Sequence, residues 1–103
     1  MARFREEVGV KTYRAAVIGC SRMGGFIDHE VAPGDMARAL PYSHAACYEA
    51  CERTELVACS DLREDVMKRC GKRYDIPKER RYTDFRELIR RERTEIVSVA
   101  TQP

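Results

Sequence analysis

Short apolar runs alternate along this chain with longer segments in which apolar residues recur at helical spacing. A short apolar run bounded by turn residues indicates a buried strand, whereas recurrence at three and four positions indicates an amphipathic helix. On this basis, strands are predicted over Tyr13 to Ile18, Glu55 to Ser60, Arg81 to Tyr82 and Ile96 to Ala100. The last run is nearly all apolar, which is typical of a strand covered on both faces.

Three helices are predicted between these strands. Ser43 is expected to be the N-cap of the first, which runs over His44 to Arg53. The second runs over Leu62 to Tyr74, with an apolar face formed by Leu62, Val66, Met67, Cys70 and Tyr74. The third follows Asp84, which has capping-box spacing with Glu87, and its inward stripe is formed by Phe85, Leu88 and Ile89.

The order of these elements predicts an α/β fold of one domain, which is what 103 residues can form. Strands that alternate with helices favour a parallel sheet with right-handed crossovers and helices on both faces. The expected strand order is 3-2-1-4, a Rossmann-like sheet truncated after its fourth strand. Residues 1–12 are interpreted as a flexible lead-in, 13–103 as a partial dinucleotide-binding domain, and 26–42 as an insertion containing Pro33, Gly34 and Pro41.

The turn after the first strand is the first candidate site. It reads Gly19-Cys20-Ser21-Arg22-Met23-Gly24, which matches the dinucleotide fingerprint G-x-G-x-x-G except for Ser21 in the place of the middle glycine. A helix is expected to begin near Arg22, so that backbone N–H groups of Arg22 and Met23 face a pyrophosphate. The small Ser21 side chain and the Arg22 guanidinium are further candidates for phosphate contacts. The alternative is an ordinary strand-to-helix turn without a ligand.

Asp61 and Arg63, which follow the second predicted strand, bear on the choice of cofactor. An acid at this position typically accepts hydrogen bonds from a ribose 2′-hydroxyl, so Asp61 favours NAD over NADP. Alternatively, Asp61 caps the following helix, because Glu64 lies at capping-box spacing. Arg63 is interpreted as a surface arginine, with contact to a 2′-phosphate as the alternative.

The end of the fourth strand supplies the last candidates. Thr101 and Gln102 are placed beside the nicotinamide-side ribose, the alternative being a frayed chain end. His44 is interpreted as structural, with the cofactor cleft as the alternative. Because the carboxyl ends of parallel strands share one edge, Gly19, Asp61 and Thr101 are expected to converge there.

Charge and cysteine content exclude other classes of function. The net charge is only +2 and acids are interleaved with the arginines, which argues against nucleic-acid binding. No apolar run approaches the length of a membrane span and no signal peptide is recognised, so the expected compartment is the cytoplasm. The five cysteines are interpreted as reduced thiols. A metal site at His44, Cys47 and Cys51 is disfavoured because it lacks a fourth ligand.

Several segments in this order resemble the N-terminal domain of the glucose–fructose oxidoreductase and inositol dehydrogenase family. They read RAAVIGCSRMG at 14–24, HAAC at 44–47, ELVACSD at 55–61, RYDIP at 73–77, YTDFRELI at 82–89 and EIVSVATQP at 95–103. The resemblance covers most of residues 14–103, whereas the segment 26–42 departs from the family pattern.

The resemblance implies a nicotinamide-dependent oxidoreductase acting on a sugar, a polyol or a related small molecule. Family members also carry a catalytic lysine in a glutamate-lysine-proline segment and a second, substrate-binding domain. These 103 residues match neither, so no catalytic residue is assigned and the chain alone is expected to be inactive. The alternatives are a non-catalytic nucleotide-binding or sensing module, a methyltransferase-type fold and a purely structural domain.

An apolar edge strand invites pairing, so self-association through Ile96 to Ala100 is also expected.

Overall fold

A computed structural model of the chain describes residues 11–27 and 43–101, except for the side chains of Arg22 and Met23. Its elements follow in the order β1 (Tyr13–Ile18), π-helix η1 (Arg22–Phe26), α1 (His44–Ala50), β2 (Thr54–Ser60), α2 (Glu64–Arg73), 3-10 helix η3 (Lys78–Arg80), β3 (Arg81–Tyr82), α3 (Phe85–Glu92) and β4 (Ile96–Val99). The predicted flexible lead-in and insertion lie largely outside the described residues.

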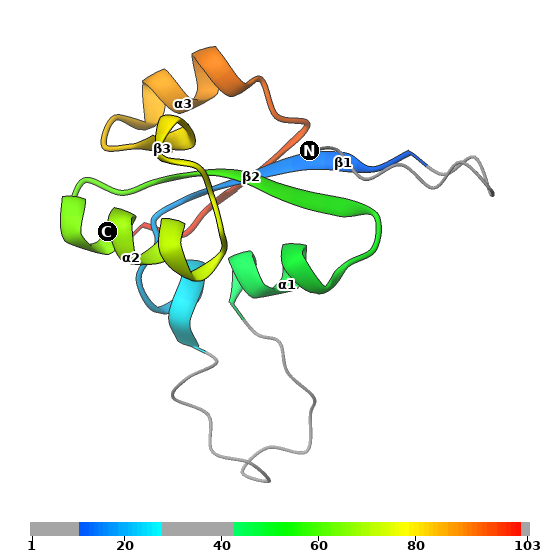
Figure 1. The fold of residues 1–103 in the computed structure, drawn as a ribbon, viewed down its shortest axis with the longest axis horizontal. Helices are drawn as coiled ribbons and strands as arrows, with labels where there is room; N and C mark the ends of the chain where they lie inside the picture. Colours follow the sequence, from blue (N-terminus) through cyan, green and yellow to red (C-terminus); the bar gives the residue numbers. More distant parts are fainter. Residues whose placement is uncertain (1–10, 28–42, 102–103) are drawn as a thin grey trace, which may run out of the picture.

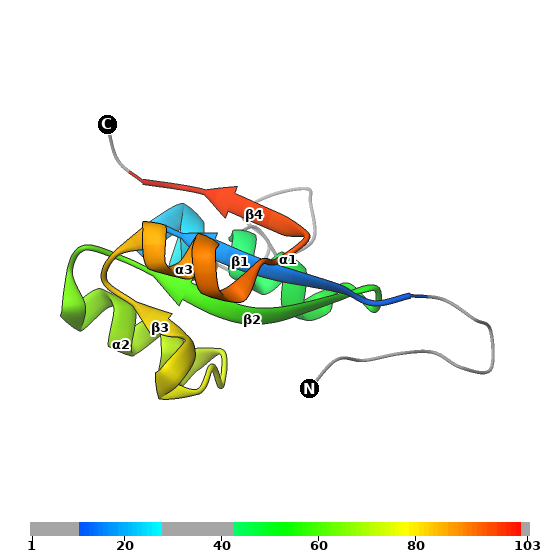
Figure 2. The same ribbon diagram turned by 90° about the horizontal axis from the view of Figure 1, so that it is seen from above.

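The four strands form one parallel sheet in the order β3-β2-β1-β4, which confirms the predicted α/β fold and strand order (Figure 1). Strand β1 pairs with β2 on one side and with β4 on the other. The β1–β2 register shifts once, between Ala15 and Ala16. Helices α1 and α2 lie on one side of the sheet and α3 lies on the other (Figures 1 and 2).

Each face of the sheet has its own apolar core because successive strand residues point to opposite faces. Val17 and Cys59 face α1 and α2 in the larger core, whereas Ala16 and Ala58 pack with Leu88 of α3 in the smaller one. Among the described residues, the largest fully buried side chains are Ile76 and Leu88. Leu88 is therefore the main contact of α3 with the sheet.

The predicted helix caps are borne out where a side chain supplies them. The Ser43 hydroxyl accepts a hydrogen bond from the Ala46 N–H at 3.1 Å, and the Asp84 carboxylate accepts one from Arg86 N–H at 2.9 Å. Glu87 does not complete the expected capping box in this structure, because its carboxylate pairs with Arg90 and Arg91.

The expected apolar faces are only partly buried. In α3, Leu88 is buried, but Phe85 and Ile89 are 40% and 50% exposed, because the helix contacts the sheet mainly through one residue. Leu62 is 86% exposed because α2 begins at Glu64, two residues later than predicted. The prediction that the last strand is covered on both faces is also wrong.

Strand β4 is the exposed edge of the sheet. Val97 and Val99 are 39% and 67% exposed, and they pair with Ala16 and Ile18 of β1. Figure 2 shows β4 at the edge of the described sheet, beyond α3. The opposite face of β4 contacts α1 instead, where Ser98 Oγ lies 3.1 Å from His44 Nδ1 and 2.5 Å from the Tyr48 hydroxyl.

Candidate functional site

A cleft of about 690 Å³ opens at the carboxyl ends of the strands. In parallel α/β sheets this edge is where ligands bind, at the point where the strand order reverses. Here that point lies between β1 and β4, because the chain moves outward from β1 to β2 and β3 before β4 returns to the other side. The cleft is lined by Ile18, Gly19, Ser21, Ser60, Asp61, Leu62, Arg63, Val66, Thr83, Phe85, Ala100 and Thr101.

Two glycines shape the turn at the base of this cleft. Gly19 has a φ of +93°, and a Cβ there would lie 2.7 Å from the backbone of Ala100 and Thr101. A Cβ on Gly24 would lie 1.7 Å from the Gly19 carbonyl oxygen, so only glycine lets η1 pack against the turn. Gly19 thus allows a tight turn and Gly24 a close packing of backbones, which are the roles of the first and third fingerprint glycines.

Asp61 joins the ends of β1 and β2 through its carboxylate. Its Oδ2 accepts the backbone N–H of Cys20 at 2.8 Å, and its Oδ1 accepts that of Arg63 at 2.9 Å. The alternative of a capping box formed by Asp61 and Glu64 is not realised: the N-cap of α2 is Arg63, which has no side-chain cap bond. Asp61 instead holds Leu62 and Arg63 in a turn that precedes the helix, and its half-exposed carboxylate lines the cleft.

The turn after β1 leads into a helix that begins at Arg22, as expected. The helix after the turn is the five-residue π-helix η1, in which the Ser21 carbonyl accepts N–H bonds from Gly25 at 3.0 Å and Phe26 at 3.1 Å. The Cys20 N–H is already bonded to Asp61. Ser21 is half-buried and lines the cleft, so its small side chain lies where close approach to a ligand requires it.

The remaining candidates are placed as follows. Arg63 borders the cleft, but its guanidinium is exposed and pairs with Asp65 at 3.3 Å, as expected for a surface arginine. Thr101 lines the cleft beside Gly19. Gln102 and the side chains of Arg22 and Met23 lie outside the described part of the chain. Gly19, Ser21, Asp61, Arg63 and Thr101 are therefore brought to one cleft by three strand ends.

Two apolar residues of the cleft were missed by sequence reasoning, which assigned them to helix cores. Leu62 directly follows the Asp61 turn, and Phe85 opens α3. Leu62 is largely exposed and Phe85 is partly exposed, and both line the cleft. Their position just after a strand end was the available signal, because such positions face the ligand edge rather than the core. They give the cleft an apolar wall next to the Asp61 carboxylate.

The disfavoured metal group around α1 does not form within the described residues. His44 points to Ser98, while Cys47 and Cys51 are exposed. The part of the chain that the structure describes contains one other set of close metal-ligating atoms, the buried Cys20, Cys59 and Cys70. Sequence reasoning had treated these three as separate small apolar residues.

Comparison with protein-family models, curated proteins and solved structures returned no match for this chain. No helix within residues 11–27 and 43–101 has the length and apolar character needed to cross a bilayer. The proposal below therefore rests on the fold, the cleft and the sequence resemblance described above.

Proposed function

We propose that this chain binds a dinucleotide, NAD in preference to NADP, in the cleft at the carboxyl edge of its sheet. The observation that carries the proposal is the convergence of Gly19, Asp61 and Thr101 on that cleft from the ends of β1, β2 and β4. Gly19 has the positive φ that a phosphate-binding turn requires, and Asp61 supplies an acid at the end of the second strand.

Six of the lining residues have a role in this proposal. The pyrophosphate lies against the turn at Gly19 and Ser21, and Asp61 accepts hydrogen bonds from the adenosine ribose. Each carboxylate oxygen has two lone pairs, so Asp61 can accept a ribose hydroxyl while it keeps the Cys20 and Arg63 N–H bonds. Leu62 and Phe85 offer apolar contact to the adenine ring, and Thr101 lies towards the nicotinamide side.

The wider function follows from the sequence resemblance. We propose that the chain is the NAD(P)-binding portion of a cytoplasmic oxidoreductase that acts on a sugar, a polyol or a related small molecule. A bound nicotinamide supplies hydride transfer, whereas this chain's own residues bind and orient the cofactor. The substrate would be held by residues beyond the cleft described above, so the isolated chain is expected to bind cofactor without turnover.

Thermal unfolding with NAD, NADP and S-adenosylmethionine tests the proposal. A ligand present at 100 times its Kd adds about 2.7 kcal/mol to the stability of the folded chain. For a domain of this size, that raises the midpoint by roughly 10 °C or more. NAD is expected to give the largest shift, and a larger shift with S-adenosylmethionine would contradict the nicotinamide assignment.

The informative variant is Asp61→Ala, read as the ligand-induced shift and not as the unliganded midpoint. The unliganded midpoint should fall in any case, because the Cys20 and Arg63 N–H groups lose their acceptor. The NAD-induced shift should largely disappear in Asp61→Ala. Asp65→Ala is the matched control, because Asp65 is an exposed acid near the same turn that does not line the cleft. A full NAD shift in Asp61→Ala would remove Asp61 from the binding site.

A further inference from the structure

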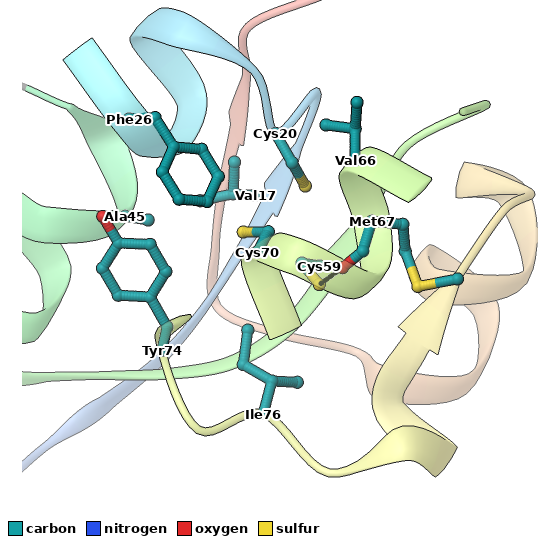
Figure 3. Close-up of a cluster of buried hydrophobic side chains, with 10 residues drawn as sticks. All are labelled: Val17, Cys20, Phe26, Ala45, Cys59, Val66, Met67, Cys70, Tyr74 and Ile76. Atoms are coloured by element: carbon teal, nitrogen blue, oxygen red, sulfur yellow. Dashed lines mark hydrogen bonds between the residues drawn. The ribbon is translucent and has the colours of Figure 1, made fainter. Parts of the chain in front are cut away.

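Three cysteines from three separate elements meet inside the larger core. Cys20 lies in the turn after β1, Cys59 in β2 and Cys70 in α2, and all three are fully buried. Their Sγ atoms all lie within 4.8 Å of one another. Figure 3 shows the three side chains close together in this core, with the Phe26 and Tyr74 rings on one side and Val66 and Met67 on the other. The arrangement is a three-sulfur site enclosed by apolar groups.

The spacing of these sulfurs suits a single metal ion. A thiolate–metal bond of about 2.3 Å places the sulfurs of a trigonal site about 4.0 Å apart. Separations of up to 4.8 Å therefore need to close by less than an ångström. Within the described residues no fourth His, Cys, Asp or Glu atom joins the group. The donor set is thus three soft sulfurs, which select soft ions such as Cu(I), whereas structural zinc sites are almost always four-coordinate.

The protonation of the three thiols is linked. Hydrogen bonds from Cys20 and Cys59 lower the pKa of Cys70, and the same thiol contacts together with burial raise the pKa of Cys20. The charges of Arg69, Arg81 and Asp61 also act on the group, the two arginines favouring thiolate and the aspartate opposing it. Binding of a metal ion by three thiolates must release thiol protons to solvent.

The thiols have protein partners that a metal ion would replace. The Cys20 thiol donates to the Ser60 carbonyl at 3.3 Å, and the Cys59 thiol donates to the Met67 carbonyl at 4.0 Å. Gly25 lies against Cys70, since a Cβ there would be 3.6 Å from its Sγ. Cys20 is fully buried, but its chain neighbours Gly19 and Ser21 line the cleft.

We propose that Cys20, Cys59 and Cys70 form a three-thiolate site for one soft metal ion of the Cu(I) class. Because Cys20 belongs to the turn at the base of the cleft, the ion would tie that turn to β2 and α2. The metal proposal does not rest on the proposed dinucleotide binding, because none of the three cysteines lines the cleft.

The test is anaerobic titration of the folded chain with Cu(I) against a competing chelator. The background is the double variant Cys47→Ala/Cys51→Ala, which removes the two exposed cysteines and leaves the three core cysteines. This variant should bind one equivalent of Cu(I), with proton release and tighter binding at higher pH. Adding Cys70→Ala should lower the affinity at least about 100-fold, because changes outside the ligand shell alone cost about 10–100-fold.

X-ray absorption of the Cu(I)-loaded double variant gives a second readout that needs no change in the core. We expect three sulfur ligands at a single copper–sulfur distance. The circular dichroism spectrum should remain that of the folded chain. Loss of binding in the double variant would assign the metal to the surface cysteines and overturn the proposal. Unchanged binding after Cys70→Ala, a two-sulfur site, or absence of binding with the fold intact would overturn it as well.

Discussion

Two carboxylates tie together parts of the chain that are far apart in sequence. Asp61 joins the ends of β1 and β2 at the cleft. Glu92, at the end of α3, accepts hydrogen bonds from the Arg14 guanidinium at 3.0 Å and the Tyr82 hydroxyl at 2.6 Å, and is buried. Sequence reasoning found Asp61 because it follows a strand, whereas Glu92 looks like one more acid on a charged helix.

The buried position of Glu92 leads to a stability prediction. Glu92→Ala leaves the Tyr82 hydroxyl without its acceptor and removes the carboxylate partner of the half-buried Arg14, whose guanidinium keeps its bond to the backbone carbonyl of residue 92. Hydrogen bonds to charged groups contribute about 1.5–3 kcal/mol, so the free energy of unfolding should fall by about 2–3 kcal/mol in a urea titration. Glu79→Ala, an exposed acid in η3, is the control and should change it by less than about 0.5 kcal/mol. Equal effects of the two substitutions would contradict the structural role of Glu92.

Tyr82 carries a pH prediction. Burial, and then the hydrogen bond to Glu92, raise the pKa of Tyr82 to about 12. The unfolded phenol ionises at about pH 10, so the folded state binds its proton more tightly. The stability gained from Tyr82 is complete below pH 10 and is lost as the pH rises towards 12. In an ultraviolet titration, the wild-type minus Tyr82→Phe difference should show one tyrosine ionising well above pH 10, and ionisation near pH 10 would contradict this.

At the scale of elements, the sequence predicted what local patterns determine. Strands β1, β2 and β4 were found because each contains a short apolar run, and β1 has the predicted bounds. The start of α2 was missed because the Asp61 side chain binds the Arg63 N–H and delays the helix. The cysteine group was not predictable, since it depends on how β2, α2 and the turn after β1 converge. Most of the cleft was predictable because parallel strand ends share one edge.

The cap of α3 gives a prediction for a single element. Asp84 is exposed and its carboxylate accepts the Arg86 N–H, so its contribution comes from the cap alone. Asp84→Ala should lower the free energy of unfolding by about 1 kcal/mol, and Asp84→Asn, which keeps an oxygen acceptor, should lower it far less. Chemical denaturation of the two variants and the wild type measures the difference. A loss of equal size in both would assign the effect to charge instead of capping.

At the scale of the whole molecule, the sheet has two edge strands of unequal length, the two-residue β3 and the four-residue β4. Strand β3 covers one edge of β2, whereas β4 is the terminal strand of the described sheet on the other side. The exposed Val97 and Val99 lie on this edge strand, on the same face as α3. An apolar edge strand of this kind offers both backbone hydrogen-bonding groups and apolar area to another strand. We propose that two copies associate through β4.

Sedimentation velocity over rising concentration measures this association. The wild type should shift from monomer towards dimer, and Val99→Lys should keep it monomeric, because a lysine on an edge strand opposes pairing. Leu62→Lys is the matched control: it also replaces an exposed apolar side chain with a charge, but at the cleft and not on β4. If Leu62→Lys abolished the dimer as well, the contact would lie at the cleft or arise from general apolar attraction. A wild type that stays monomeric at the highest concentration would show that the β4 edge is not used between copies.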